Sequence, residues 1–339
     1  MNEMTKLTAK DFATDQEVRW CPGCGDYAVL KAVQRTMPDL GVAREKTVFV
    51  SGIGCSSRFP YYMETYGFHT IHGRAPAFAT GIKLANPALD VWLITGDGDG
   101  LSIGGNHMLH VLRRNVDLQI LLFNNEIYGL TKGQYSPTSR IGTRTPSSPQ
   151  GSVDRPASPC AFALGAGARF IARSIDTAQK HLPEMLKRAH AHRSASFLEI
   201  YQNCVVYNDG VFEDFTAKKA APERQINLVH GERMIFGGGT KGLKLNRGDL
   251  RLEVTAADDP DVLVHDETNK SVAQMLIDMD PREFPVAIGV LYCDPAQSFD
   301  ASLAERGTAA TFTGDLNGLL RKGQSWTVAP KDGFTTAGG

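Results

Sequence analysis

The segment VWLITGDGDG, residues 91–100, opens as a run of apolar and β-branched residues and ends in a turn of alternating glycine and aspartate. A short continuous apolar run bounded by turn residues is typical of a parallel strand that is covered on both faces. Three more runs share this pattern, at residues 47–50, 118–123 and 197–200. The first leads into the turn SGIG (51–54), and the second into Asn124-Asn125.

Helical patterns lie between these expected strands. Residues 106–114 place apolar side chains on one helical face, and so do residues 177–192, for which Asp176 is the expected N-cap. Alternating strands and helices predict an α/β fold with a doubly wound parallel sheet. In such folds ligands bind outside the carboxyl ends of the strands, so the turns after three of the strands are expected to converge on one site.

The chain divides by composition into three parts. We expect an N-terminal segment (1–46), an α/β domain (47–219) and a C-terminal extension (220–339) that covers the first domain or a neighbouring subunit. Residues 135–160 contain five prolines and predict a loop on the surface or at a partner contact. In the extension, 237–239 and 247–261 look irregular, whereas 262–265 and 286–291 are candidate strands.

The overall charge excludes some classes of function. Lys and Arg together number 36 and Asp and Glu 37, which leaves a formal net charge of −1. This balance argues against a nucleic-acid partner or an anionic membrane surface. The sequence has neither an apolar stretch at its start nor a run of about 18 apolar residues, so we expect no secretory signal and no membrane span. The expected location is the cytoplasm.

The two polar turns carry the residues that a diphosphate bound through Mg²⁺ requires. Asp97 offers a carboxylate, and Asn125, which follows the next strand, offers an amide oxygen. The Ile127 carbonyl can supply a third oxygen, and Mg²⁺ prefers such ligands in octahedral geometry. Neighbouring glycines allow backbone N–H groups to approach phosphates closely. The alternative for an isolated Gly-Asp-Gly is a tight turn, but the paired asparagines at this spacing favour ligands.

Four of the six cysteines form a second constellation. Cys21 and Cys24 make a C-x-x-C pair, while Cys55 and Cys204 each follow an expected strand. Four thiolates suit either Zn²⁺ or a [4Fe–4S] cluster, and the spacing alone does not choose between them. Cys160 and Cys293 are interpreted as buried apolar thiols.

Several motifs in one order resemble a known family. These are WCPGCG (20–25), GIGCSS (52–57), HGRA (72–75), GDGDG (96–100) and FNNEIYGLTKGQ (123–134), followed by Cys204. Together they resemble the β subunit of 2-oxoacid:ferredoxin oxidoreductases, across about residues 18–210. The segment from Gly96 to Asn125 also resembles the thiamine diphosphate motif, which implies the sheet of thiamine-diphosphate enzymes.

The resemblance implies two bound groups. One is a [4Fe–4S] cluster on Cys21, Cys24, Cys55 and Cys204; the other is thiamine diphosphate with Mg²⁺ on Asp97, Asn125 and the Ile127 carbonyl. The cofactor pocket that it implies comprises Ile53, Gly54, Cys55, Ser56, His72, Gly96, Asp97, Gly98, Asp99, Asn125, Ile127, Leu130 and Thr131. For His72 a hydrogen-bonded structural role is the alternative.

The resemblance also implies the reaction and the partners. It is the coenzyme A-dependent oxidative decarboxylation of a 2-oxoacid, with electrons leaving through the cluster to ferredoxin. LTKGQ (130–134) resembles the form that accepts 2-oxoglutarate or a broader set of 2-oxoacids, because pyruvate-type members usually carry a more polar residue where Leu130 stands. Arg58 is the candidate partner of a distal substrate carboxylate, with an exposed surface arginine as the alternative.

No catalytic base is assigned to this chain. In the family a carboxylate of the α subunit activates the thiazolium, so we expect an α2β2 assembly and an inactive isolated chain. Two rival interpretations stay open. One is a cluster-free thiamine-dependent decarboxylase or dehydrogenase component with structural zinc, and the other is a zinc-stabilised nucleotide-binding regulatory or scaffold subunit.

Overall fold

The computed structural model describes residues 7–307 and 315–322. It groups residues up to Ala301 in one compact unit and those from Ser302 onward in a second. The predicted boundaries at 46/47 and 219/220 therefore fall inside the first unit. Within the second unit, the described residues include the helix α11 (Leu316–Arg321). None of the described helices is long and apolar enough to cross a membrane.

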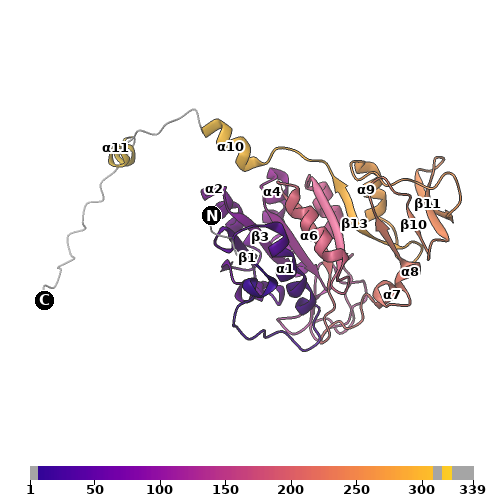
Figure 1. The fold of residues 1–339 in the computed structure, drawn as a ribbon. Coiled ribbons are helices and arrows are strands. Elements are labelled where there is room, and N and C mark those ends of the chain that lie inside the picture. Colours follow the sequence, from indigo (N-terminus) through magenta and orange to yellow (C-terminus); the bar gives the residue numbers. More distant parts are fainter. Residues whose placement is uncertain (1–6, 308–314, 323–339) are drawn as a thin grey trace. The chain divides into compact units, whose positions relative to one another are not determined.

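An eight-stranded sheet forms the centre of the first unit (Figure 1). All neighbouring pairs of strands are parallel except β7 and β13. In spatial order the strands are β2 (Tyr66–His69), β1 (Thr47–Ser51), β3 (Asp90–Gly96), β4 (Gln119–Asn124), β8 (Ser196–Tyr201), β7 (Phe170–Ile175), β13 (Val286–Cys293) and β9 (Gln225–Leu228). The four strands predicted at 47–50, 91–95, 118–123 and 197–200 are confirmed as β1, β3, β4 and β8.

Helices cover both faces of this sheet, which confirms the doubly wound α/β fold. Alternate residues of one strand point to opposite faces. In β3, for example, Leu93 packs in one apolar cluster and Trp92 in the other. The first cluster includes residues of α2 (Ala75–Ala85), α4 (Gly105–Arg114), α5 (Pro159–Gly165) and α9 (Lys270–Ile277). The second includes residues of α1 (Asp26–Leu40) and α6 (His181–Ala191), which pack side by side.

The remaining elements are short. A three-stranded sheet consists of β10 (Ile235–Phe236), β11 (Lys241–Asn246) and β12 (Arg251–Ala256), and a two-stranded one of β5 (Ile127–Tyr128) and β6 (Gln134–Tyr135). The other helices are η1 (Ala9–Phe12), η2 (Arg44–Lys46), η3 (Ser56–Tyr62), α3 (Asp97–Leu101), α7 (Glu213–Thr216), α8 (Ala221–Arg224) and α10 (Phe299–Gly307).

The start of the helix predicted at 177–192 is wrong. α6 begins at His181 with Lys180 as its N-cap, and Asp176 instead accepts a hydrogen bond from the Asn203 backbone N–H at 2.9 Å. A helix from residue 177 would place Pro183 in its interior, where the ring clashes with the carbonyl four residues earlier. Starting at His181 puts Pro183 in the first turn, where it is tolerated.

Two predictions in the C-terminal part are also wrong. Residues 251–256 form β12 rather than irregular structure, because β12 pairs along its length with β11 and buries Leu252. Residues 262–265 make only isolated bridges, through Val262 and Val264. By contrast the strand expected at 286–291 is confirmed as β13, and Gly237–Gly239 form a turn with positive φ.

The register of the parallel strands aligns their carboxyl ends. Ser51 lies opposite Ile94, Gly96 opposite Phe123, and Asn124 opposite Tyr201. The turns that follow β1, β3, β4 and β8 therefore emerge along one edge of the sheet.

A buried ion pair ties the middle of the sheet together. Arg173 on β7 lies opposite Glu199 on β8, with 2.8 Å between Nε and Oε2. The Asn124 amide donates to the other Glu199 oxygen at 2.8 Å, and Arg173 also donates to the Ala287 carbonyl of β13. The pair thus connects β4, β8, β7 and β13.

Arg173→Met is expected to lower the free energy of unfolding by about 3–5 kcal/mol, because it leaves the Glu199 charge buried without its partner. Urea denaturation of the chain measures the change. The matched control is Lys241→Met, which breaks the half-exposed pair with Glu223 and should cost no more than about 1 kcal/mol. Equal losses in the two variants would contradict the importance of the buried pair.

Candidate functional site

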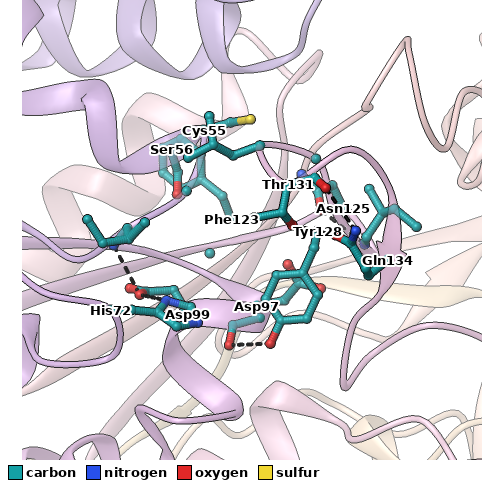
Figure 2. Close-up of a pocket in the computed structure, with 17 residues that line it drawn as sticks. Cys55, Ser56, His72, Asp97, Asp99, Phe123, Asn125, Tyr128, Thr131 and Gln134 are labelled. Carbon is teal, nitrogen blue, oxygen red and sulfur yellow. Dashed lines mark hydrogen bonds and ion pairs between the residues drawn. The ribbon is translucent and has the colours of Figure 1, made fainter. Parts of the chain in front are cut away.

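A cavity of about 480 Å³ lies at the carboxyl edge of the sheet (Figure 2). Every residue that the sequence predicted for the cofactor pocket lines it, from Ile53 through Asp97 to Thr131. Four further residues that sequence reasoning did not single out complete the lining: Phe123, Tyr128, Gly129 and Gln134. All four belong to the FNNEIYGLTKGQ motif, which is the signal that points to them.

Asp99 connects the turns that surround this cavity. Its Oδ1 accepts hydrogen bonds from the backbone N–H of Ile53 and of Gly73, at 3.1 and 2.7 Å, and from Nδ1 of His72 at 2.7 Å. Its Oδ2 accepts one from Thr95 at 2.7 Å. Because one buried carboxylate accepts from the GIGCSS turn, the HGRA turn and β3, it fixes their relative positions. His72 thus has both of the roles that the sequence offered for it. It makes a structural hydrogen bond to Asp99, and it lines the cavity.

Asp97 begins α3, directly after β3, and only 2 % of its surface is exposed. Burial raises the pKa of its carboxyl group to about 6, while hydrogen bonds from Ser136 and Thr138 act in the opposite direction. Both hydroxyls donate to Oδ2, at 2.5 and 2.6 Å. A buried carboxylate held by neutral hydroxyl donors is a suitable ligand for a divalent ion, which would stabilise its charged form.

The turn after β4 borders the same cavity and carries neutral amide and carbonyl oxygens. Asn125 and Ile127 both line it, and the Asn125 Oδ1 accepts from the Ile127 N–H at 3.2 Å. The Asn125 amide donates to Gln202, and Asn208 donates to the Asn125 carbonyl. Glu126, between them, has a φ of 55° and pairs with Arg140. One carboxylate with neighbouring amide and carbonyl oxygens fits the preference of Mg²⁺.

Two positions in the cavity wall require glycine. A Cβ at Gly98 would lie 2.2 Å from the Tyr128 ring, whose hydroxyl donates to the Gly98 carbonyl at 3.0 Å. Gly54 has a φ of +137°, which side chains other than glycine rarely adopt. Glu64 and Glu126 are carboxylates that lie near these motifs in the sequence, and neither lines the cavity.

The four candidate cysteines line a second cavity, of about 270 Å³. Burial raises the pKa of Cys55 to about 12 and also raises that of Cys24, so these thiols are neutral without a bound positive group. Gly129 lies beside two of the sulfurs, since a Cβ there would be 3.4 Å from Sγ of Cys55 and 3.6 Å from Sγ of Cys204. Within the described ranges, no three Cys, His, Asp or Glu side chains stand close enough to hold a metal ion.

The two cavities are adjacent. Both are lined by Cys55, Asn125, Gly129 and Leu130. The two predicted substrate residues differ in position, because Leu130 lines both cavities whereas Arg58 lines only the cysteine cavity of the two. Arg58 donates to the Arg19 carbonyl at 3.0 Å. Cys160 and Cys293 are buried away from both cavities, as the sequence predicts.

Comparison with known proteins agrees with this arrangement. Residues 52–200 match the family model described as thiamine pyrophosphate enzyme, C-terminal TPP binding domain. The fold and the site thus define a domain of the thiamine-pyrophosphate enzyme class.

The relatives give the family. The chain is 48 % identical over 332 residues to the 2-oxoglutarate oxidoreductase subunit KorB of Mycobacterium tuberculosis, covering 94 % of this chain and 88 % of that one. It is 48 % identical over 206 residues to the β subunit of an Aeropyrum pernix 2-oxoacid:ferredoxin oxidoreductase, covering 61 % and 65 %. The chain belongs to the family of 2-oxoacid:ferredoxin oxidoreductase β subunits, oxidoreductases that work within a subunit complex, which confirms the predicted family.

A solved structure agrees in fold. It is the 2-oxoglutarate:ferredoxin oxidoreductase of Magnetococcus marinus with 2-oxoglutarate, coenzyme A and succinyl-CoA bound. The TM-score is 0.76 at 31 % identity, over 96 % of this chain and 98 % of that one.

Gly52→Ala is expected to lower the free energy of unfolding by about 1–3 kcal/mol, as overpacking in a well-packed site does. The reason is that its Cβ would lie 2.0 Å from Oδ2 of Asp99 and would push the GIGCSS turn away from that carboxylate. The control is Gly81→Ala inside α2, where the Cβ meets nothing within 4 Å; better helix propensity should raise stability slightly there. Thermal denaturation measures both, and an unchanged Gly52→Ala variant would contradict a close Asp99 contact.

Proposed function

We propose that this chain binds thiamine diphosphate with Mg²⁺ in the larger cavity and a [4Fe–4S] cluster in the cysteine cavity. With an α subunit it would carry out the coenzyme A-dependent oxidative decarboxylation of 2-oxoglutarate to succinyl-CoA and CO₂, with ferredoxin as electron acceptor. The observation that carries this proposal is the shared wall of the two cavities, formed by Cys55, Asn125, Gly129 and Leu130. It would bring a decarboxylation site and a redox centre into contact.

The residues of the larger cavity divide the binding task. Asp97, Asn125 and the Ile127 carbonyl would hold Mg²⁺, while the backbone around Gly96 and Gly98 would receive the diphosphate. When bound, thiamine diphosphate supplies the ring that accepts the electron pair released as CO₂ leaves. Asp99 keeps the surrounding turns in place, and the apolar lining from Ile53, Phe123 and Leu130 excludes water.

The cysteine cavity supports a cluster better than a single zinc ion. One Zn²⁺ needs four ligands within about 2.3 Å of a common centre. The described thiols line a cavity of about 270 Å³ without any three of these side chains standing close enough to hold an ion. A larger group that bridges separate thiolates fits this arrangement, and a cluster passes electrons singly. Reduced cysteines also persist in a reducing compartment, so we propose a cytoplasmic location.

The choice of 2-oxoglutarate rests on two residues and on the names of relatives. Leu130 lines both cavities, and Arg58 lines the adjoining one, where its guanidinium is available to a distal carboxylate. The Mycobacterium tuberculosis relative is named for 2-oxoglutarate, and the Aeropyrum pernix relative for 2-oxoacids in general. Pyruvate or a broader range of 2-oxoacids is therefore the alternative.

The chain purified without oxygen should contain about four iron atoms and four sulfide ions per molecule. It should also show a broad absorption band at about 400 nm. Serine in place of Cys21, Cys24, Cys55 or Cys204 should remove most of the iron. Cys160→Ser is the control, because its hydroxyl can donate to Glu199 as the thiol does at 3.1 Å. Colourless protein with one zinc would instead support the cluster-free rival.

The complete reaction provides the decisive test. The chain purified with its partner subunit should reduce ferredoxin or a viologen with 2-oxoglutarate and coenzyme A, faster than with pyruvate. Asp97→Ala should lower this rate by about 100-fold or more, since even outer-shell changes at metal sites cost 10–100-fold. Asp249→Ala, at an exposed turn, is the control.

Two outcomes would contradict the proposal. Robust turnover by the isolated chain would contradict a base supplied by the partner. Unaltered thiamine diphosphate binding in Asp97→Ala would favour a non-catalytic subunit.

A further inference from the structure

The proline-rich segment between β6 and α5 contacts a residue of the larger cavity, Asp97. The sequence indicated a surface loop or a partner contact, and no helix or strand lies between Tyr135 and Pro159. Yet Ser136, Thr138 and Ser139 are buried. None of the three lines the larger cavity, so they lie behind its wall rather than in it.

Two of these side chains engage the same carboxylate oxygen. Ser136 Oγ and Thr138 Oγ1 lie 2.5 and 2.6 Å from Oδ2 of Asp97. Each hydroxyl has one hydrogen to donate, and one carboxylate oxygen offers about two lone-pair sites. The side-chain donors thus meet at Oδ2, while no side chain among the described residues donates to Oδ1. Backbone N–H groups of Asp97 and Gly98 also bond the carboxylate, so Oδ1 is the Asp97 oxygen with fewer protein donors and the one that faces an ion in the cavity in this proposal.

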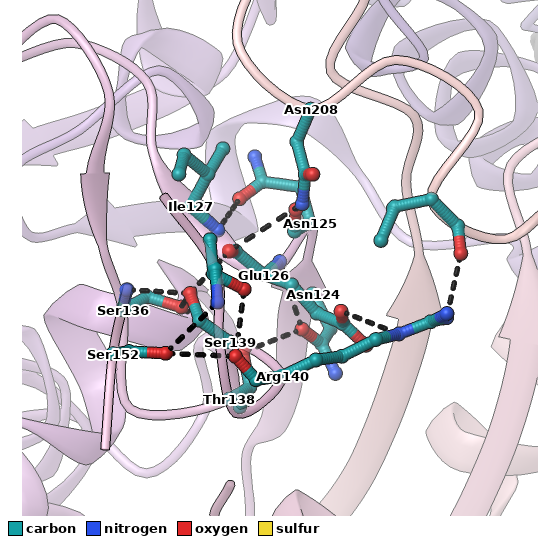
Figure 3. Close-up of polar contacts among 12 residues, drawn as sticks. Asn124, Asn125, Glu126, Ile127, Ser136, Thr138, Ser139, Arg140, Ser152 and Asn208 are labelled. Atoms are coloured by element: carbon teal, nitrogen blue, oxygen red, sulfur yellow. Dashed lines mark hydrogen bonds and ion pairs between the residues drawn. The ribbon is translucent and has the colours of Figure 1, made fainter. Parts of the chain in front are cut away.

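The loop is itself anchored to the turn that carries the neutral oxygens (Figure 3). Ser139 donates to the Glu126 carbonyl at 2.5 Å and accepts from the Ser136 N–H at 2.7 Å. Thr138 Oγ1 also lies 3.0 Å from Oδ1 of Asn124, so its one hydrogen is shared between this amide oxygen and Asp97. Asn124 in turn is held by Glu199, the partner of Arg173. Thr138 is thus linked to the end of β4, and Ser136 is linked through Ser139 to the turn that follows it, so these contacts oppose a movement of either hydroxyl with the Asp97 carboxylate.

This arrangement matters for the choice of metal ion. Ca²⁺ is larger than Mg²⁺ and accepts bidentate carboxylates in a flexible shell, whereas Mg²⁺ requires near-ideal octahedral geometry at shorter distances. A carboxylate that offers only one oxygen from a fixed position serves the smaller ion better.

We propose that Ser136 and Thr138 are positioning residues that restrict Asp97 to one-oxygen coordination and so make the diphosphate site select Mg²⁺ over Ca²⁺. The inference rests on the proposed thiamine diphosphate site and adds two residues that act through Asp97. Without the two hydroxyls, Asp97 is free to rotate and to bind an ion through both oxygens.

The test is calorimetric titration of thiamine diphosphate into the chain with its partner subunit, with saturating Mg²⁺ or Ca²⁺. The readout is the ratio of the two dissociation constants, Kd with Ca²⁺ over Kd with Mg²⁺. Ser136→Ala, Thr138→Val and the double variant should each lower this ratio, the double variant by about tenfold or more, as the loss of charge-assisted hydrogen bonds suggests. General damage to the fold would weaken both titrations and leave the ratio unchanged.

Two controls sharpen the test. Thr138→Ser keeps the hydroxyl and should keep the wild-type ratio, and Ser147→Ala removes an exposed hydroxyl of the same loop without effect. An unchanged ratio in both single variants would overturn the inference, even if the double variant does not fold. Failure of the proposed function looks different, because wild-type protein would then bind thiamine diphosphate equally well with and without a divalent ion.

Discussion

The hydrogen bonds that converge on the Asp99 carboxylate hold the site together. Parallel strands bring their carboxyl ends to one edge of a sheet, but they do not fix how the following turns lie against one another. Asp99 does so by accepting from Ile53, His72, Gly73 and Thr95. Asp97 lies two residues before Asp99 and lines the same cavity, together with residues from the turns after β1 and β4. The positions of the residues that line the cavity therefore depend on Asp99, both of whose carboxylate oxygens accept hydrogen bonds from the protein.

The sequence predicted those parts of the fold that local pattern determines. The runs around Val48, Leu93, Leu121 and Leu198 are continuous and apolar because both faces of their strands are buried. The start of α6 was missed because the sequence pattern favours Asp176 as the N-cap, whereas its carboxylate accepts from the Asn203 backbone N–H and Pro183 belongs in the first turn. β12 was missed because its alternation buries only Leu252 among charged residues.

The candidate site divides in the same way. Residues within motifs, such as Asp97, Asn125 and the four cysteines, were predicted, and the structure brings them to two adjacent cavities. Ser136 and Thr138 were not, because a hydroxyl in a proline-rich loop carries no periodic signal. Their contact with Asp97 spans about forty residues of chain and exists only once the loop has folded back. Short polar side chains that act across such distances need a structure to reveal them.

Gly129 illustrates how closely the two cavities constrain each other. A Cβ there would be in van der Waals contact with the sulfurs of Cys55 and Cys204, and its neighbour Leu130 lines both cavities. On the proposed function, a mutation that reshapes the acid-binding end of the site also alters the packing and polarity around the cluster, which set its reduction potential. Substrate preference and the driving force for electron transfer would then change together in evolution. A protein that comes to accept a different 2-oxoacid would also need changes in the same few residues to restore the reduction potential of the cluster.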